Sequence, residues 1–215
     1  MVKVIIFDYD GVIVDSFPSV FAVYQKICQK FGVAFPEDIE TFRVVYGYSY
    51  FECLKNLGIS EDDFDVVQSM FKNEIVKMDH KVFQDISEVI TELAKNYKLF
   101  LVSSSHSQEV LPKIAKLGLA ISFEKIYCGA DQKSHKSALF KEVLRDFDYS
   151  PEEVIIIGDR AIDYDSAKRL GIDDRNIILV NYGWGLDKNR IGNAKVAENP
   201  KEILNLINNF LIKNV

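Results

Sequence analysis

The chain has 215 residues, of which 48% are hydrophobic and 27% charged, and its formal net charge is -6. This composition is typical of globular proteins and excludes the fibrous, disordered and disulfide-scaffold classes. The negative charge argues against a nucleic-acid partner, because proteins that bind phosphate backbones concentrate lysine and arginine. The length permits one domain or two.

Neither a membrane nor an oxidising compartment is expected for this chain. Its apolar N-terminal stretch, residues 2–14, is interrupted by Asp8, Asp10 and Gly11. A signal peptide or a membrane span of ~20 residues does not tolerate such an interruption. The 3 cysteines lie far apart and lack the spacing of a zinc site. We therefore expect free thiols in a cytoplasmic protein, and both a monomer and a homodimer stay open.

Short apolar runs rich in β-branched residues alternate with helical patterns along most of the chain. The predicted strands are residues 4–7, 98–102, 125–128, 154–157 and 176–180. A last helix is predicted over residues 202–212, with Asn199 able to cap it and Pro200 at its first position. This alternation predicts an α/β fold, a Rossmann-like open and mostly parallel sheet with helices on both faces.

Residues 17–85 interrupt this alternation. From Phe17 onward, apolar residues recur there at three- and four-residue spacing without a convincing strand. We expect this segment to form an all-helical cap domain, inserted into a core domain made of residues 1–16 and 86–215. Because the insert leaves the sheet just after the first strand, we interpret it as a lid rather than as a stabilising extension.

Acidic residues follow two of the predicted strands. Ligands of parallel sheets bind beyond the carboxyl ends of the strands, where Asp8 and Asp10 follow the first strand and Asp159 the fourth. Carboxylates held close together repel unless they share a proton or a cation, and Mg²⁺ prefers such oxygen ligands. A DxDG segment by itself is as typical of a turn or a calcium-binding loop as it is of a catalytic site. Asp159 comes near Asp8 only if their strands are neighbours, and Asp163 could instead cap a helix.

Several segments resemble the motifs of the haloacid dehalogenase superfamily. Residues 8–16, DYDGVIVDS, resemble the first motif of its phosphatases, which is DxDG with Asp-Ser soon after. A serine closing the second strand (Ser103), a lysine before the helix that leads to the fourth strand, and an acidic motif at residues 158–163 follow in the family's order. Residues 181–185 are similar to a turn of phosphoglycolate-phosphatase-like members. The motifs together cover nearly the whole chain.

The resemblance implies a Mg²⁺-dependent phosphatase that acts on a small phosphorylated metabolite. Asp8 is then the nucleophile that forms an aspartyl-phosphate, and Asp10 is the general acid and base. The metal ligands implied are a carboxylate oxygen of Asp8, the main-chain carbonyl of Asp10, and Asp159. Asp163 would be a further ligand or support the others. Ser103 and the lysine would bind the transferring phosphoryl oxygens.

The lysine motif departs from the family pattern. The chain has KSHKS at residues 133–137, where related members usually have Lys-Pro-x-Pro. Counted back from Asp159, that pattern falls on Ser134, whereas a lysine directly at the helix start, as in other members, falls on Lys136. We therefore choose Lys136 over Lys133 as the phosphate-binding residue.

The main alternative is a β-phosphoglucomutase-like phosphotransferase, which keeps all the acids. Members of that kind carry an arginine after Gly-x-Ser in the cap, where this chain has Tyr50. A dehalogenase is disfavoured by Asp10, because the dehalogenase motif lacks the second carboxylate. A non-catalytic binding module is disfavoured as well, since it has no reason to retain such costly clustering of charge.

Overall fold

The computed structural model describes residues 2–129 and 135–212, with side chains through residue 209. Its internal contacts divide the chain into two compact units. The first unit contains Met1–Asp15 and Val82–Val215, and the second contains Ser16–Lys81. The second unit is therefore an insertion into the first.

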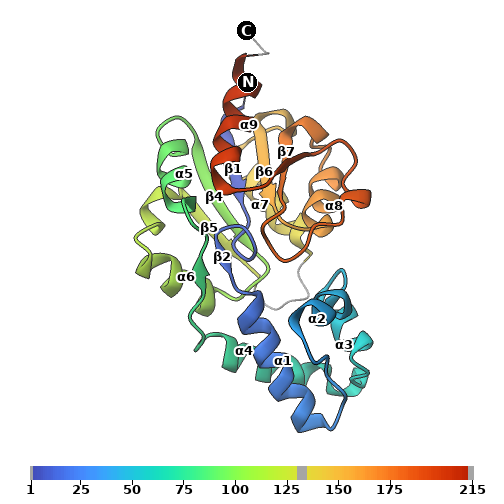
Figure 1. Ribbon diagram of the computed structural model, residues 1–215. Helices are drawn as coiled ribbons and strands as arrows, with labels where there is room; N and C mark the ends of the chain where they lie inside the picture. Colours follow the sequence, from blue (N-terminus) through green and yellow to red (C-terminus); the bar gives the residue numbers. More distant parts are fainter. Residues whose placement is uncertain (1, 130–134, 213–215) are drawn as a thin grey trace. The chain divides into compact units, whose positions relative to one another are not determined.

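The first unit is built on a six-stranded sheet of order β5-β4-β1-β6-β7-β8, in which the paired strands are parallel (Figure 1). The strands are β1 (Val4–Phe7), β4 (Lys98–Ser103), β5 (Lys125–Cys128), β6 (Val154–Gly158), β7 (Ile177–Val180) and β8 (Lys195–Ala197). All four residues of the central strand β1 are buried, as a strand covered on both faces requires. The predicted Rossmann-like sheet is confirmed.

Helices cover both faces of this sheet. One face carries α5 (Ile86–Leu93), α6 (Ser107–Lys116) and α9 (Pro200–Ile212), and the other carries α7 (Lys136–Phe147) and α8 (Ala161–Arg169). Successive side chains of a strand point to opposite faces. Ile5 and Phe7 of β1 accordingly join the core beneath α5, α6 and α9, whereas Val4 and Ile6 join the core beneath α7 and α8.

Three short strands are not among the strands predicted from the sequence. β8 has three residues and lies at the edge of the main sheet. β2 (Val14–Asp15) and β3 (Lys81–Val82) pair where the chain passes into the second unit and returns. Strands of two or three residues are too short to show the alternation or the apolar run by which strands are recognised. Single 3₁₀ turns lie at Glu61–Asp63, Ala120–Ser122, Pro151–Glu153, Asp174–Asn176 and Lys188–Arg190.

The second unit is helical, as the spacing of its apolar residues predicts. Its helices are α1 (Phe17–Phe31), α2 (Ile39–Tyr46), α3 (Tyr50–Asn56) and α4 (Phe64–Ile75). Phe17, Val20 and Tyr24 lie on the buried face of α1. The centroid of the Tyr24 ring lies 5.5 Å from that of Phe42 and 5.3 Å from that of Phe71. Aromatic side chains from three helices thus give this unit a core of its own.

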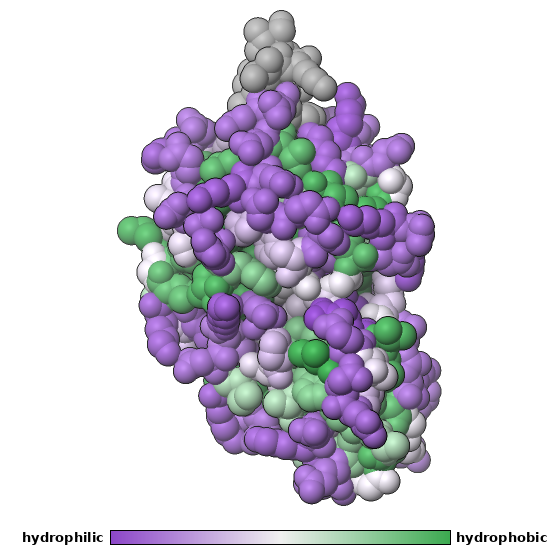
Figure 2. Space-filling view, in the orientation of Figure 1, coloured by the Kyte–Doolittle hydropathy of each residue, from purple (hydrophilic) through white to green (hydrophobic). Residues whose placement is uncertain are grey.

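Hydrophilic side chains cover much of the visible surface of the chain, with smaller apolar areas between them (Figure 2). Among the described residues, no helix combines the length and the apolar character that a bilayer crossing demands.

The start of β6 is tied to the start of β1 by a carboxylate. Glu153 forms an ion pair with Lys3 and accepts a hydrogen bond from the main-chain N–H of Ser150 at 3.1 Å. Lys3 first and Ser150 second lower the pKa of Glu153 from 4.5 to about 2. Since the folded chain then binds this proton less tightly than the unfolded chain, Glu153 stabilises the fold above pH 4.5, and its contribution is lost as the pH falls toward 2.

Glu153→Gln is therefore expected to lower the urea midpoint of unfolding at pH 7, and to lower it less at pH 3, as measured by circular dichroism. A difference from wild type that is the same at both pH values would contradict the assigned ion pair.

Candidate functional site

Acidic side chains converge at the carboxyl edge of the sheet, beyond its central strands. β1 and β6 are neighbours, with Phe7 paired to Ile157, so Asp8 and Asp159 leave the sheet side by side. Carboxylate oxygens of Asp8, Asp159 and Asp163 lie within 4.8 Å of one another, and all three side chains are buried. The sequence places Asp8 near Asp159 only if their strands are neighbours, and the strand order shows that they are.

A buried ammonium group lies among these carboxylates. Lys136, the first residue of α7, is 4% exposed, and its Nζ contacts Oδ2 of Asp8 and lies 2.5 Å from Oδ1 of Asp163. Burial by itself would lower the pKa of Lys136, but the charges of Asp163 and Asp8 outweigh it and raise the pKa above its ordinary value. The lysine therefore stays charged. Lys133 and Ser134, the other positions considered for this motif, lie outside the described residues.

The cluster contains more carboxyl groups than ammonium groups, so it favours uptake of a proton or a cation. Burial raises the pKa of Asp8 well above its ordinary value; Lys136 opposes this shift, whereas Asp163 adds to it. Burial also raises the pKa of Asp159 to about 7, and the charge of Asp163 adds to that shift. Three buried carboxylates thus share one ammonium group. Hard oxygen donors with uncompensated charge are the donor set that Mg²⁺ prefers, so these residues fit a divalent cation.

Asp163 uses its two carboxylate oxygens for different purposes. Its Oδ2 accepts hydrogen bonds from the main-chain N–H groups of Asp159 and Arg160, both at 3.1 Å. These bonds tie the first turn of α8, which contains Asp163, to the two residues that precede the helix. Its Oδ1 pairs with Lys136. Asp163 therefore caps the helix through Oδ2 and takes part in the acidic cluster through Oδ1.

The carboxylate of Asp10 faces a different part of the edge from that of Asp8. Its Oδ2 accepts a hydrogen bond from Oγ of Ser105 at 2.7 Å, and Oγ of Ser103 lies 3.5 Å from the same oxygen. Ser103 is buried at the end of β4. The chain thus directs Asp8 toward the helices α7 and α8, and Asp10 toward the loop after β4.

Asp159 is held by the loop that follows β7. The main-chain N–H of Trp184 donates a hydrogen bond to Oδ2 of Asp159 at 2.7 Å. Gly11 and Gly183 both approach the Asp159 carboxylate so closely that a Cβ at either position would overlap it. Gly11 also has a φ of 75°, a left-handed conformation that glycine adopts without strain. The loop after β1 and the loop after β7 therefore both hold this carboxylate in place.

Two polar groups of the site are not predicted from the sequence. Ser105 contacts Asp10, and the only available signal is the run of serines at 103–105. Glu109 in α6 is 3% exposed and pairs with Lys113 at 3.2 Å. Burial raises the pKa of Glu109 to about 7, and the charge of Asp10 adds to the shift while Lys113 opposes it. Glu109 gives no signal in the sequence, because a glutamate beside the apolar positions of a helix usually faces solvent.

Comparison with known proteins identifies the family. Residues 5–176 match the sequence model of the haloacid dehalogenase-like hydrolases. The chain belongs to this family. The matched span includes all the residues assigned to the site from the sequence, namely Asp8, Asp10, Ser103, Lys136, Asp159 and Asp163.

Individual relatives of this hydrolase align over most of their length. The chain is 25% identical to the phosphorylated carbohydrates phosphatase of Thermotoga maritima, over 97% of this chain and 100% of the relative. It is 25% identical to the phosphoglycolate phosphatase of Synechococcus elongatus, over 86% and 85% of the two chains. Its fold is similar to that of a haloacid dehalogenase-like hydrolase of Streptococcus pneumoniae, with a TM-score of 0.83 and 22% identity over 96% and 98% of the chains.

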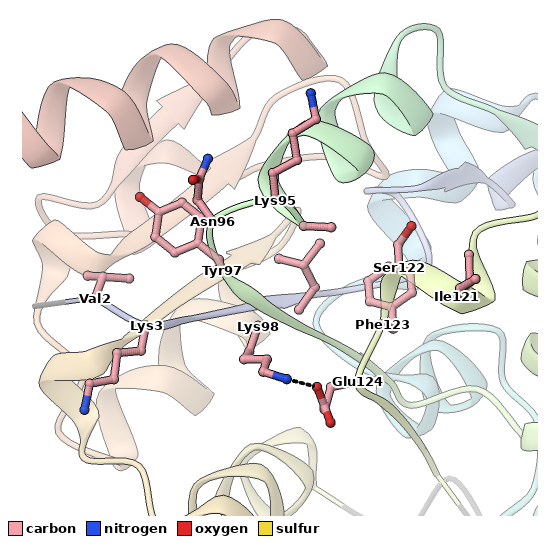
Figure 3. A pocket seen from close by; sticks show the side chains of 12 residues that line it. Val2, Lys3, Lys95, Asn96, Tyr97, Lys98, Ile121, Ser122, Phe123 and Glu124 are labelled. Atoms are coloured by element: carbon pink, nitrogen blue, oxygen red, sulfur yellow. Dashed lines mark hydrogen bonds and ion pairs between the residues drawn. The ribbon is translucent and has the colours of Figure 1, made fainter.

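A cavity of about 780 Å³ in this haloacid dehalogenase-like hydrolase lies at the opposite edge of the sheet (Figure 3). It is lined by residues at the amino ends of β1 and β4, including Lys3, Lys95 and Lys98. Each of these lysines pairs with a glutamate: Lys3 with Glu153, Lys95 with Glu92 at 2.5 Å, and Lys98 with Glu124 at 2.5 Å. Their charges are therefore already compensated, and the cavity is a weaker candidate for an anion site than the carboxyl edge.

Gly11→Ala is expected to destabilise this hydrolase more than Gly171→Ala. Gly171 has a similar φ of 79°, but a Cβ there meets no atom within 4 Å. Gly171→Ala should therefore cost only the left-handed strain, about 1–2 kcal/mol. Gly11→Ala should cost about 1–3 kcal/mol more, because the Asp159 carboxylate must move.

Urea unfolding of both variants measures this difference. Equal losses of unfolding free energy would show that Gly11 is required only for its backbone conformation.

Proposed function

We propose that the chain is a Mg²⁺-dependent phosphomonoesterase that acts on a small phosphorylated metabolite. The observation that carries this proposal is the convergence of Asp8, Asp159, Asp163 and Lys136 at one buried edge of the sheet. Family membership supports it, because that edge lies within the span that matches the hydrolase family. A site with both a cation position and an ammonium group suits the charge of a phosphoryl group.

In the first step, a carboxylate oxygen of Asp8 attacks phosphorus, and the bond between phosphorus and the leaving oxygen breaks. Asp10 gives its proton to that oxygen, so the leaving group departs as a neutral alcohol. The product on the enzyme is an aspartyl-phosphate on Asp8. Ser103 and Lys136 bind phosphoryl oxygens and neutralise part of their charge while the transfer takes place.

In the second step, Asp10 takes a proton from a water molecule as the water attacks phosphorus. The bond between phosphorus and Asp8 breaks, which releases inorganic phosphate and restores the nucleophile. Asp8, Asp159 and the main-chain carbonyl of Asp10 would hold Mg²⁺, with Asp163 as a ligand or a support. The ion, when bound, draws charge from the phosphoryl oxygens and offsets the repulsion between Asp8 and the anionic substrate.

We propose small phosphomonoesters as substrates because of the names of the relatives and the negative net charge of the chain. The curated relatives are named for phosphorylated carbohydrates and for phosphoglycolate, which are small phosphomonoesters. A net charge of -6 disfavours long polyanions as substrates. We also propose a reducing, cytoplasmic environment, since Cys28, Cys53 and Cys128 form no disulfide bond.

Asp8→Asn should abolish phosphate release from an aryl phosphate in the presence of Mg²⁺, because an amide cannot act as the nucleophile. The asparagine keeps the shape of the side chain, and a thermal melt checks that the variant is folded. Chelation of the metal should abolish the wild-type activity reversibly. Phosphate release that survives Asp8→Asn would overturn the assignment of the nucleophile.

A panel of sugar, nucleotide and short-acid phosphates identifies the substrate class. Inclusion of β-glucose 1-phosphate, with analysis for an isomerised sugar phosphate, separates hydrolysis from phosphoryl transfer within one substrate. Isomerisation without phosphate release would replace the phosphatase proposal by the phosphotransferase alternative.

Lys136→Ala should lower kcat by about 10²- to 10³-fold, the usual loss when one donor to a developing anion is removed. Lys133→Ala should change kcat by less than about threefold, because a residue that makes no contact in the transition state contributes little to kcat. Equal small losses in the two variants, measured by steady-state phosphate release, would remove Lys136 from the proposed machinery.

A further inference from the structure

We propose that Ser105 is a positioning residue for the proton transfer by Asp10. This role rests on the proposed phosphatase function, in which Asp10 protonates the leaving oxygen. Ser105 is the second residue after β4, and its Oγ donates a hydrogen bond to Oδ2 of Asp10 at 2.7 Å. Neither family membership nor the motif serine at 103 assigns a task to this hydroxyl group.

The contact between Ser105 and Asp10 is the shorter of the two serine contacts at that carboxylate. Oγ of Ser103 lies 3.5 Å from the same oxygen, at the limit of a hydrogen bond. Ser103 also receives a hydrogen bond at its Oγ, from the main-chain N–H of Ser105 at 3.0 Å. Ser105 therefore positions the two polar groups through different atoms, Asp10 through its hydroxyl and Ser103 through its amide.

This arrangement has a chemical consequence for the two oxygens of Asp10. A hydroxyl donor at Oδ2 favours the carboxyl rotamer in which that oxygen stays in the loop after β4. Proton exchange with the leaving group then falls to Oδ1, at a fixed place. General acid catalysis depends on such placement, since the proton must lie within hydrogen-bond reach of the oxygen that receives it.

Removal of the Ser105 hydroxyl should weaken proton transfer and leave phosphoryl binding intact. Ser105→Ala deletes the contact to Asp10 but keeps the main-chain N–H that binds Ser103. A leaving group of low pKa departs without a proton, whereas an alkoxide needs one. The loss in kcat/KM should therefore depend on the leaving group, a pattern that general loosening of the site would not produce.

The test compares kcat/KM for a simple alkyl phosphate and for 2,4-dinitrophenyl phosphate, with Mg²⁺ present. Ser105→Ala is expected to lose about 10- to 100-fold with the alkyl ester, part of the ~10²–10⁴-fold that general acid catalysis supplies. With the dinitrophenyl ester it should lose less than about threefold. Ser105→Thr, which keeps a hydroxyl, should recover most of the loss.

Ser104→Ala is the matched control. It removes a hydroxyl from the same loop, but the side chain of Ser104 is exposed, and the variant should resemble wild type with both esters. Equal losses of Ser105→Ala with both esters, in an enzyme that hydrolyses both, would overturn the role of Ser105 and leave the phosphatase proposal standing. Failure of the wild-type protein to hydrolyse either ester would overturn the phosphatase proposal and the role of Ser105 together.

Discussion

The buried ammonium group of Lys136 is the interaction on which the carboxyl edge of the sheet depends. It joins the end of β1 to the start of α8, because it contacts Asp8 on one side and Asp163 on the other. Removal of one partner from a buried ion pair typically costs about 3–5 kcal/mol, because the remaining charge stays without compensation. Here the ammonium group of Lys136 contacts two carboxylates, so it influences both the local structure of the edge and the charge of its acidic residues.

The two carboxylates of the DxDG segment lie in different surroundings although they are only two residues apart. Asp8 ends its strand among other acids and a lysine, whereas Asp10 lies two residues further on, against serine hydroxyls. Gly11 then lets the chain turn tightly between Asp159 and the next loop. In the proposed mechanism, the nucleophile Asp8 needs neighbouring cations to approach an anion, and the proton donor Asp10 needs hydrogen bonds that fix its direction. A tight turn after the first strand places the two carboxylates in these different surroundings.

Much of the fold follows from local patterns, but parts of the site do not. Strands such as β1 and β6 can be predicted because they are short runs of apolar, β-branched residues. Such runs are typical of strands in a parallel sheet that is covered on both faces. The choice of Lys136 comes from the resemblance to the family, in which a lysine at the helix start has this spacing before the acidic motif. Ser105 and Glu109 become visible as neighbours of Asp10 only in the structure, because their positions depend on which way a loop and a helix turn. Serine and glutamate are common surface residues, so their types alone carry no such information.

The insertion of the helical unit after β1 has a consequence for synthesis of the chain. Asp159 and Asp163 follow Asp8 in the chain by about 150 residues. The helical unit, Ser16–Lys81, is complete long before the ribosome reaches β6, and it contains an aromatic core of its own. The first strand finds its partners β4 and β6 only across this insertion, and the acidic edge assembles only after Asp159 and Asp163 have been translated.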